Sequence, residues 1–198
     1  RGLGDVYKRQ VLNTVSAASM TVTGTVLDTI TSMRLSGDFI MSSPASITAN
    51  IGLIAASDIN VQTGTSIDLT GRGFLHPGAG TGTGPGGGGA AGGWSSGGGA
   101  SHGGVGGDGN GASNGVGNAT PYGDATMPIT KGSSGGHGMN FPTASAGLGG
   151  DGGGAMKLVA TNTLTVNGTL RVNGTNGTCN LQAGGGGSGG SIWLDGGT

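Results

Sequence analysis

Residues 157–177 decide how this chain folds. They read Lys157-Leu-Val-Ala-Thr-Asn-Thr-Leu-Thr-Val-Asn-Gly-Thr-Leu-Arg-Val-Asn-Gly-Thr-Asn-Gly177. Apolar and small polar residues alternate here in three short runs, whose apolar members are Leu158/Ala160, Leu164/Val166 and Leu170/Val172. Such alternation predicts strands with one buried face, and the Asn-Gly steps between the runs supply turn residues. The block therefore predicts three short strands joined by tight corners.

A second block, earlier in the chain, matches the first. It reads Gly52-Leu-Ile-Ala-Ala-Ser-Asp-Ile-Asn-Val-Gln-Thr-Gly-Thr-Ser-Ile-Asp-Leu-Thr-Gly-Arg-Gly73, with the apolar pairs Leu53/Ala55, Ile59/Val61 and Ile67/Leu69. Looser pairs continue upstream to Val11, and Pro44 is expected at a corner because proline cannot serve a central strand. A repeat of roughly 20 to 25 residues, each burying its inner face on its neighbours, is typical of solenoids. The sequence therefore predicts an all-β fold: a right-handed parallel β-helix of a few turns.

A glycine-rich segment separates the two blocks. The chain holds 51 glycines, and most of them lie in residues 72–155. Glycine has no side chain to bury and loses much backbone entropy on ordering, so we expect a long, largely irregular insertion. The alternative is extended, polyproline-II-like packing of backbone against backbone, which the missing Cβ atoms allow. A further alternative is a partly ordered loop that lies on the β-helix and is pinned by aromatic residues such as Trp94, Tyr122 and Phe141.

The expected organisation follows from these patterns. Residues 11–71 are β-helix turns, 72–155 are the insertion, and 156–198 are a β-helix continuation that stops after a strand begins, so we expect a fragment of a longer protein. Residues 1–10, Arg1-Gly-Leu-Gly-Asp-Val-Tyr-Lys-Arg-Gln10, resemble translated adapter read-through from short-read sequencing. We therefore leave them out of the fold reasoning, as a sequencing artefact.

Composition narrows the function classes. The nine acidic residues are all Asp, and the formal net charge is −1. No basic patch with interleaved aromatic residues occurs, so nucleic acid is not an expected partner, and no apolar run approaches the length of a membrane span. The single cysteine, Cys179, excludes an internal disulfide framework. Abundant Thr, Ser, Asn and Gly suit an extracellular or cell-surface protein, with carbohydrate or a cell-surface protein as partner.

No convincing catalytic, cofactor or metal site emerges from the sequence. Charged candidates on the predicted β-helix are Asp58, Asp68, Arg72, Lys157, Arg171 and Asp195, but no two carboxylates sit two residues apart on one strand, so a solvated outer face explains them. Asp108 and Asp151 follow Gly-rich steps that partly match a calcium-binding repeat, yet calcium needs six to eight oxygen ligands. The three histidines, His76, His102 and His137, have no metal-ligand spacing.

The glycine run that restarts a strand, Gly187-Ser-Gly-Gly-Ser-Ile-Trp-Leu194, resembles glycine-rich β-helix segments of large secreted or surface proteins. These are of the pectin-lyase-like type and of the adhesin or autotransporter-passenger type. The resemblance implies a structural or adhesive module without catalytic activity of its own. One alternative is a fragment of a β-helix polysaccharide lyase or hydrolase whose catalytic turns lie elsewhere. A second alternative is a flexible glycine-rich matrix protein.

Overall fold

The computed structural model describes residues 14–26, 31–48, 50–139 and 147–197. These residues form two compact units, each described here by itself. The stacked-sheet unit comprises the described residues of Arg1–Leu69, Met156–Arg171 and Ile192–Thr198. The glycine-rich unit comprises those of Thr70–Ala155 and Val172–Ser191. The predicted artefact (residues 1–10) and Phe141 lie outside the described residues.

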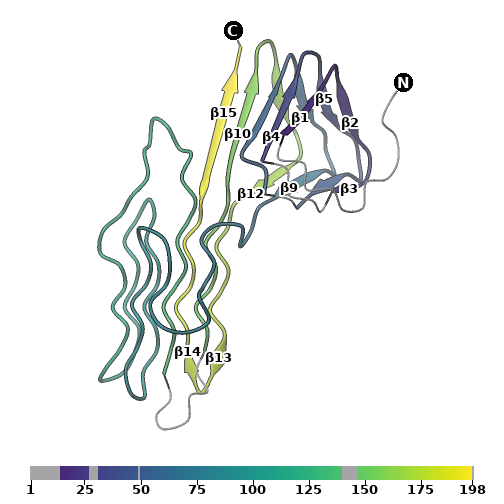
Figure 1. The fold of residues 1–198 in the computed structure, drawn as a ribbon. Coiled ribbons are helices and arrows are strands. Elements are labelled where there is room, and N and C mark those ends of the chain that lie inside the picture. The colour runs from purple at the N-terminus through teal and green to yellow at the C-terminus, as the bar shows by residue number, and fades with distance from the viewer. Residues whose placement is uncertain (1–13, 27–30, 49, 140–146, 198) are drawn as a thin grey trace. The chain divides into compact units, whose positions relative to one another are not determined.

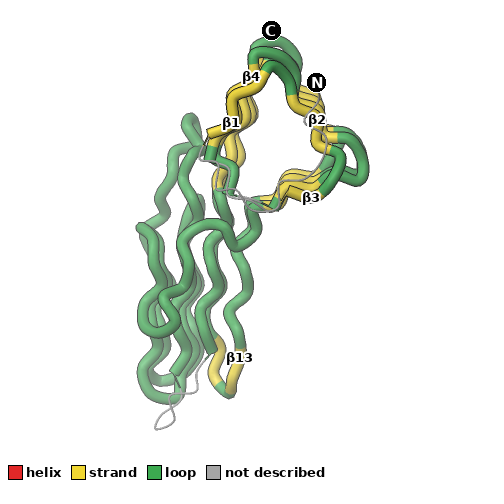
Figure 2. Tube along the Cα trace, turned by 45° about the vertical axis from the view of Figure 1, so that its right-hand side comes forward, coloured by secondary structure: helices red, strands yellow, loops and turns green. Residues whose placement is uncertain are grey.

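The stacked-sheet unit consists of three parallel sheets whose strands stack in sequence order (Figures 1 and 2). The first sheet has the order β1-β4-β7-β10-β15 and contains β1 (Thr14–Ala17), β4 (Ser32–Leu35), β7 (Leu53–Ala56), β10 (Ala155–Ala160) and β15 (Ser191–Gly196). The second contains β2 (Met20–Val22), β5 (Phe39–Met41), β8 (Ile59–Val61) and β11 (Leu164–Val166). The third contains β3 (Thr25–Val26), β6 (Ser46–Ile47), β9 (Ser66–Asp68) and β12 (Thr169–Arg171).

This arrangement confirms the all-β class and the three strands expected for each block. Figure 2 shows the strands of successive coils lying over one another on three faces. The register is continuous: Phe39 pairs with Met20 on one side and with Ile59 on the other. Pro44 lies in the turn between β5 and β6, as expected. The unit is therefore consistent with a parallel β-helix, in which every coil needs its neighbours to bury its inner face.

The core of the stacked-sheet unit is a stack of large apolar side chains. Phe39, Met41, Ile54, Ile59 and Ile67 are all at most 1% exposed. Burial alternates along the strands, as in Ile59-Asn60-Val61, where only the middle residue faces outward. At about 25 cal/mol per Å² of apolar surface, such burial is the main stabilising term for this unit.

One predicted strand face is wrong. The inward residues of β7 are Ile54 and Ala56, not Leu53 and Ala55. Pairing with β10 places Leu158 beside Ile54 and Ala160 beside Ala56. A shift of one residue moves a strand's whole apolar set to the other face. In the run Leu53–Ala56 all four residues are apolar, so the sequence pattern cannot select the face and the stacking decides it.

The glycine-rich unit is built from extended segments joined by tight turns. Residues 97, 98 and 99 donate their backbone N–H groups to the carbonyls of Ala183, Gly89 and Gly107, which belong to three different segments. Three residues later, Ala100 donates to Gly186, again in the segment that bonds Gly97.

The same period recurs across the unit. Residues 132, 135 and 138 donate to the carbonyls of 153, 150 and 147, and residues 147, 150 and 153 donate to those of 182, 185 and 188. Polyproline II has three residues per turn and no internal hydrogen bonds, so its N–H groups can bond neighbours in three directions. The segments of this unit therefore pair through their backbones in a regular pattern with a three-residue period.

Close packing of these segments requires glycine at the contacts. A Cβ atom at Gly136 would overlap the carbonyl oxygen of Gly89, and one at Gly185 would overlap that of Gly98. Ala91 is the single described apolar residue of this unit that is buried, whereas the buried polar residues are Ser95, Ser101, Ser133, Ser134, His137 and Ser191. Hydrogen bonds between backbones, rather than apolar side chains, therefore make the interior of this unit.

The glycine-rich unit also contains a later stretch of the chain. Residues 172–191, expected to continue the β-helix, belong to the glycine-rich unit. The N–H groups of residues 184, 187 and 190 donate to the carbonyls of Thr178, Thr175 and Val172, which repeats the three-residue period. The described residues also contain no helix, and thus none with the length and apolar character needed to cross a bilayer.

Candidate binding surface

The pairings within the glycine-rich unit define its two ends. One end lies where the chain enters or leaves the unit, at Thr70, Ala155, Val172 and Ser191. These positions are near one another because the N–H of residue 190 donates to the carbonyl of Val172, and residue 153 is hydrogen-bonded to residues 132 and 188. We call this the crossing end. The opposite end is formed by the turns 92–95 and 110–114 and by the hairpin 179–183. We call these three turns the tip.

The tip is held together by hydrogen bonds between its turns. The Ser95 hydroxyl accepts the N–H of Ser113 at 3.0 Å, and the Ser96 hydroxyl lies 3.5 Å from the side-chain oxygen of Gln182. The hairpin consists of β13 (Cys179–Asn180) and β14 (Gln182–Ala183), with Leu181 alone at its turn. Three separate stretches of sequence therefore meet at one surface.

Large apolar side chains at the tip face solvent. Trp94 is 59% exposed and Leu181 is 72% exposed. Leu181 also has φ = 64°, and it is the sole non-glycine residue with positive φ among the described residues. A bulky side chain in this region is an outlier that is disfavoured by about 1–3 kcal/mol. The sequence thus keeps an exposed leucine where glycine or asparagine would be more stable, and sequence reasoning had no signal for it.

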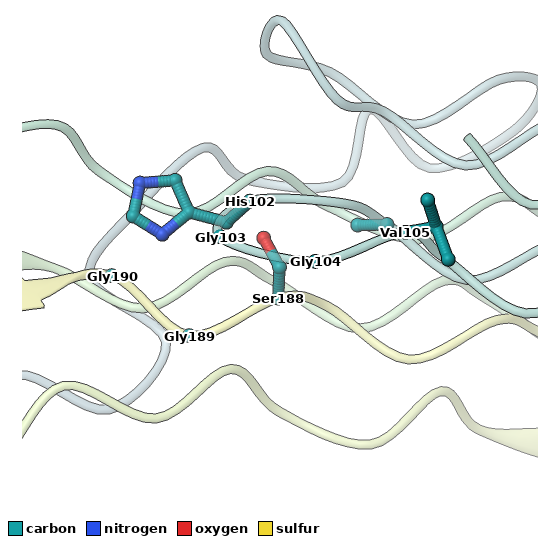
Figure 3. A pocket seen from close by; sticks show the side chains of 8 residues that line it. His102, Gly103, Gly104, Val105, Ser188, Gly189 and Gly190 are labelled. Carbon is teal, nitrogen blue, oxygen red and sulfur yellow. The ribbon is translucent and has the colours of Figure 1, made fainter. Parts of the chain in front are cut away.

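A shallow depression of about 240 Å³ lies at the crossing end (Figure 3). Its lining residues are Ala100, His102, Gly103, Gly104, Val105, Ser188, Gly189 and Gly190. The His102 Nε2 atom lies 2.7 Å from the Thr130 hydroxyl, and the ring packs edge-on against Tyr122 with centroids 4.7 Å apart. His102 is the single titratable residue of the lining, so the depression brings together no acid–base pair.

The charged candidates on the stacked-sheet unit make structural interactions. Arg171 and Asp68 pair in register on β12 and β9 and form an ion pair at 3.6 Å. Asp58 accepts the N–H of Thr163 at 2.8 Å, and the Lys157 ammonium lies 3.4 Å from the ring centroid of Trp193. An exposed ion pair contributes about 0–1 kcal/mol. Asp195 is exposed, and so is Arg72, which belongs to the glycine-rich unit.

The two calcium candidates accept backbone hydrogen bonds. Asp108 Oδ1 accepts the N–H of Gly117 at 2.8 Å, and Asp151 Oδ1 accepts that of His76 at 2.6 Å. Within the described parts of the chain, no group of three or more His, Cys, Asp or Glu side chains could hold a metal ion. Asp108 and Asp151, the two weak calcium candidates of the sequence, therefore have visible roles in fixing backbone segments.

His76 and His137 stack on each other with ring centroids 6.3 Å apart. His76 Nδ1 accepts the N–H of Gly78 at 3.1 Å, whereas its Nε2 is buried without a hydrogen-bond partner. Burial, and next the neighbouring His137, lower the pKa of His76 below 6.5, although Asp151 opposes the shift. Burial also lowers the pKa of His102. Both rings therefore favour the neutral state in the folded protein.

We expect the protein to lose stability as the pH falls below about 6.5, because the unfolded chain then binds protons that these two folded-state rings resist. The stabilisation from the two neutral histidine rings is complete above the histidine pKa of the unfolded chain. It declines as the pH falls toward the lower pKa that these rings have in the folded protein. Urea unfolding at pH 7.5, 6.5 and 5.5, followed by circular dichroism, measures this slope. The double variant His76→Asn/His102→Asn should flatten it, and equal slopes in the two proteins would contradict the assignment.

Comparisons of this chain with models of protein families, with curated proteins and with solved structures find no match.

Proposed function

We propose that this chain is a structural or adhesive module of a secreted or cell-surface protein. In this proposal the stacked-sheet unit is a right-handed parallel β-helix that provides a stiff support, and the glycine-rich unit is a display scaffold. The two units are stabilised by different interactions. Apolar burial stabilises the first, while hydrogen bonds between backbones hold the second.

The observation that carries the proposal is where the glycine-rich unit places its large apolar residues. The buried residues described in this unit are glycines, serines, His137 and Ala91, while residues such as Trp94, Val105, Ile129 and Leu181 are more than half exposed. An ordinary fold buries such side chains because burying each contributes about 1.5–3 kcal/mol. A frame that is held by backbone hydrogen bonds and leaves such side chains in solvent has the anatomy of a binding scaffold.

Composition supports the extracellular placement. Threonine, serine, asparagine and glycine dominate, charged residues make up 9% of the chain, and glutamate is absent. The parallel sheets also fit the resemblance to glycine-rich β-helix segments of surface proteins at the level of architecture. Carbohydrate and cell-surface proteins are the partners that such a module would take.

A retention assay tests the proposal. Beads that carry the full chain are passed over surfaces coated with neutral polysaccharides, acidic polysaccharides or extracellular-matrix proteins. The same polysaccharides are also assayed for soluble products after contact with the chain. We expect retention on at least one surface, with no release of reducing ends or unsaturated products. Product release would instead assign the chain to the polysaccharide lyases or hydrolases. Absence of retention on every surface would overturn the adhesive role.

A further inference from the structure

We infer that the tip of the glycine-rich unit is a carbohydrate-binding surface for neutral glycans, with Trp94 and Leu181 as its apolar contacts. This inference rests on the proposed adhesive function and assigns it a site and a ligand class. It is carried by the meeting of three turns at one end, by the exposure of the two side chains, and by the charge of the surface.

The pairing of two segments brings the turns that carry Trp94 and Leu181 to the same end of the unit. Gly97 bonds the carbonyl of Ala183 and Ala100 bonds that of Gly186, so these two segments run parallel with a three-residue repeat. The hairpin reverses at Leu181, where Asn180 pairs with Gln182, and the turn that carries Trp94 lies three residues beyond Gly97, so both turns close this end of the two segments. The Ser96–Gln182 contact at 3.5 Å ties the same two segments together just behind them.

The third turn lies against the backbone of the first. A Cβ atom at Gly111 would meet the side chain of Ser95 and, at 2.9 Å, the carbonyl oxygen of Trp94. Gly111 has φ = 117°, which glycine alone adopts readily. This close approach places the turn that holds Asn110 and Ser113, both exposed, against the backbone of Trp94. The tip is therefore a composite surface whose turns carry an exposed indole together with amide and hydroxyl side chains.

The residue types at the tip indicate which class of ligand this surface can bind. Residues 92–95, 110–114 and 179–183 include no Asp, Glu, Lys, Arg or His. The nearest carboxylate in sequence, that of Asp108, is already bonded to the N–H of Gly117. An indole offers a flat apolar face with a polar edge, and amide side chains both donate and accept hydrogen bonds. Such a surface complements the C–H faces and hydroxyls of uncharged sugars, and it offers nothing to neutralise sulfate, phosphate or uronate groups.

The backbone of Leu181 adds independent support. A leucine at φ = 64°, 72% exposed at a hairpin turn, destabilises the hairpin relative to asparagine or glycine. Disfavoured backbone geometry of this kind is concentrated at functional sites. The substitution Leu181→Asn should therefore raise the midpoint of thermal unfolding, or leave it unchanged, while it weakens binding. A merely structural role for Leu181 predicts no effect on binding.

The test is an array of neutral oligosaccharides of glucose, mannose, galactose and N-acetylglucosamine, printed beside sulfated and uronate-containing glycans and probed with the full chain. We expect binding to neutral members, and a loss of about tenfold or more in affinity for Trp94→Ala, as for a central aromatic contact. Ile129→Ser is the matched control, because Ile129 is 58% exposed but lies outside the tip. Thermal unfolding of each variant shows that it is folded.

The outcomes separate this inference from the proposed function. Neutral-glycan binding that is lost in Trp94→Ala and weakened in Leu181→Asn, but kept in Ile129→Ser, supports the assignment. Binding only to acidic glycans or proteins, or neutral binding that survives Trp94→Ala, overturns the inference and leaves the adhesive function standing. Failure to bind any glycan, together with failure in the retention assay, overturns both.

Discussion

The substitution Gly136→Ala is expected to destabilise the glycine-rich unit by about 3 kcal/mol or more, the upper range for forcing atoms into a packed interior. Gly136 donates its N–H to Gly98 at 2.9 Å and accepts that of Gly185 at 2.8 Å. An added methyl group would overlap the backbone carbonyl of Gly89, which belongs to a third segment. No side chain can move aside, so whole segments would have to separate.

Amide hydrogen exchange measured by mass spectrometry reports this opening, because exchange protection follows local stability. The protected amides of residues 97–101 should exchange much faster in Gly136→Ala. Gly107→Ala is the control: a Cβ atom there would meet nothing within 4 Å, so we expect no loss, or a gain of about 0.4–1 kcal/mol from reduced freedom of the unfolded chain. Equal exchange in the two variants would refute the backbone-packing account.

The substitution Phe39→Ala is expected to destabilise the stacked-sheet unit by about 3–5 kcal/mol, the usual range for removing a fully buried aromatic ring. Phe39 lies on β5, is 0% exposed, and pairs with Met20 and Ile59 on the neighbouring coils. Because each coil relies on its neighbours, the cavity would weaken the packing on both sides of β5.

Tryptophan fluorescence during urea unfolding measures this loss. The chain has two tryptophans, one in each unit, so a Trp94→Phe background leaves Trp193 to report on the stacked-sheet unit. Ile40→Ala provides the comparison on the same strand, because Ile40 faces outward and is half-buried. We expect it to cost about 1 kcal/mol or less. A similar loss for both variants would mean that the inward face does not carry the stability.

The parts of this fold that were predictable are those where side chains alternate in character. Ile59-Asn60-Val61 shows one apolar face, and the structure buries that face. Leu53–Ala56 is apolar throughout, so its inward face follows from pairing with β10 and not from its own pattern. Local sequence sets the face of a strand only when the opposite face is polar.

The glycine-rich unit was less predictable because glycine carries no side-chain pattern. Its order comes from the directions of successive N–H groups, and each group finds its partner in a distant segment, as when residue 97 bonds Ala183. The candidate surface was hidden for the same reason. Trp94 and Leu181 are far apart in sequence, and the positive φ of Leu181 has no local signal. The recurring glycine runs could have suggested the extended packing but not which segments are neighbours.

The three-direction hydrogen bonding of the glycine-rich unit has a thermodynamic consequence. Exposure of apolar surface gives ordinary domains a heat-capacity increase on unfolding of about 12–15 cal/mol/K per residue. A unit whose interior consists of peptide groups exposes little apolar surface, and exposed polar surface lowers the heat capacity. Its stability curve is therefore flatter than that of a burial-driven fold. Cooling, which weakens the hydrophobic effect, removes little of what holds this unit together.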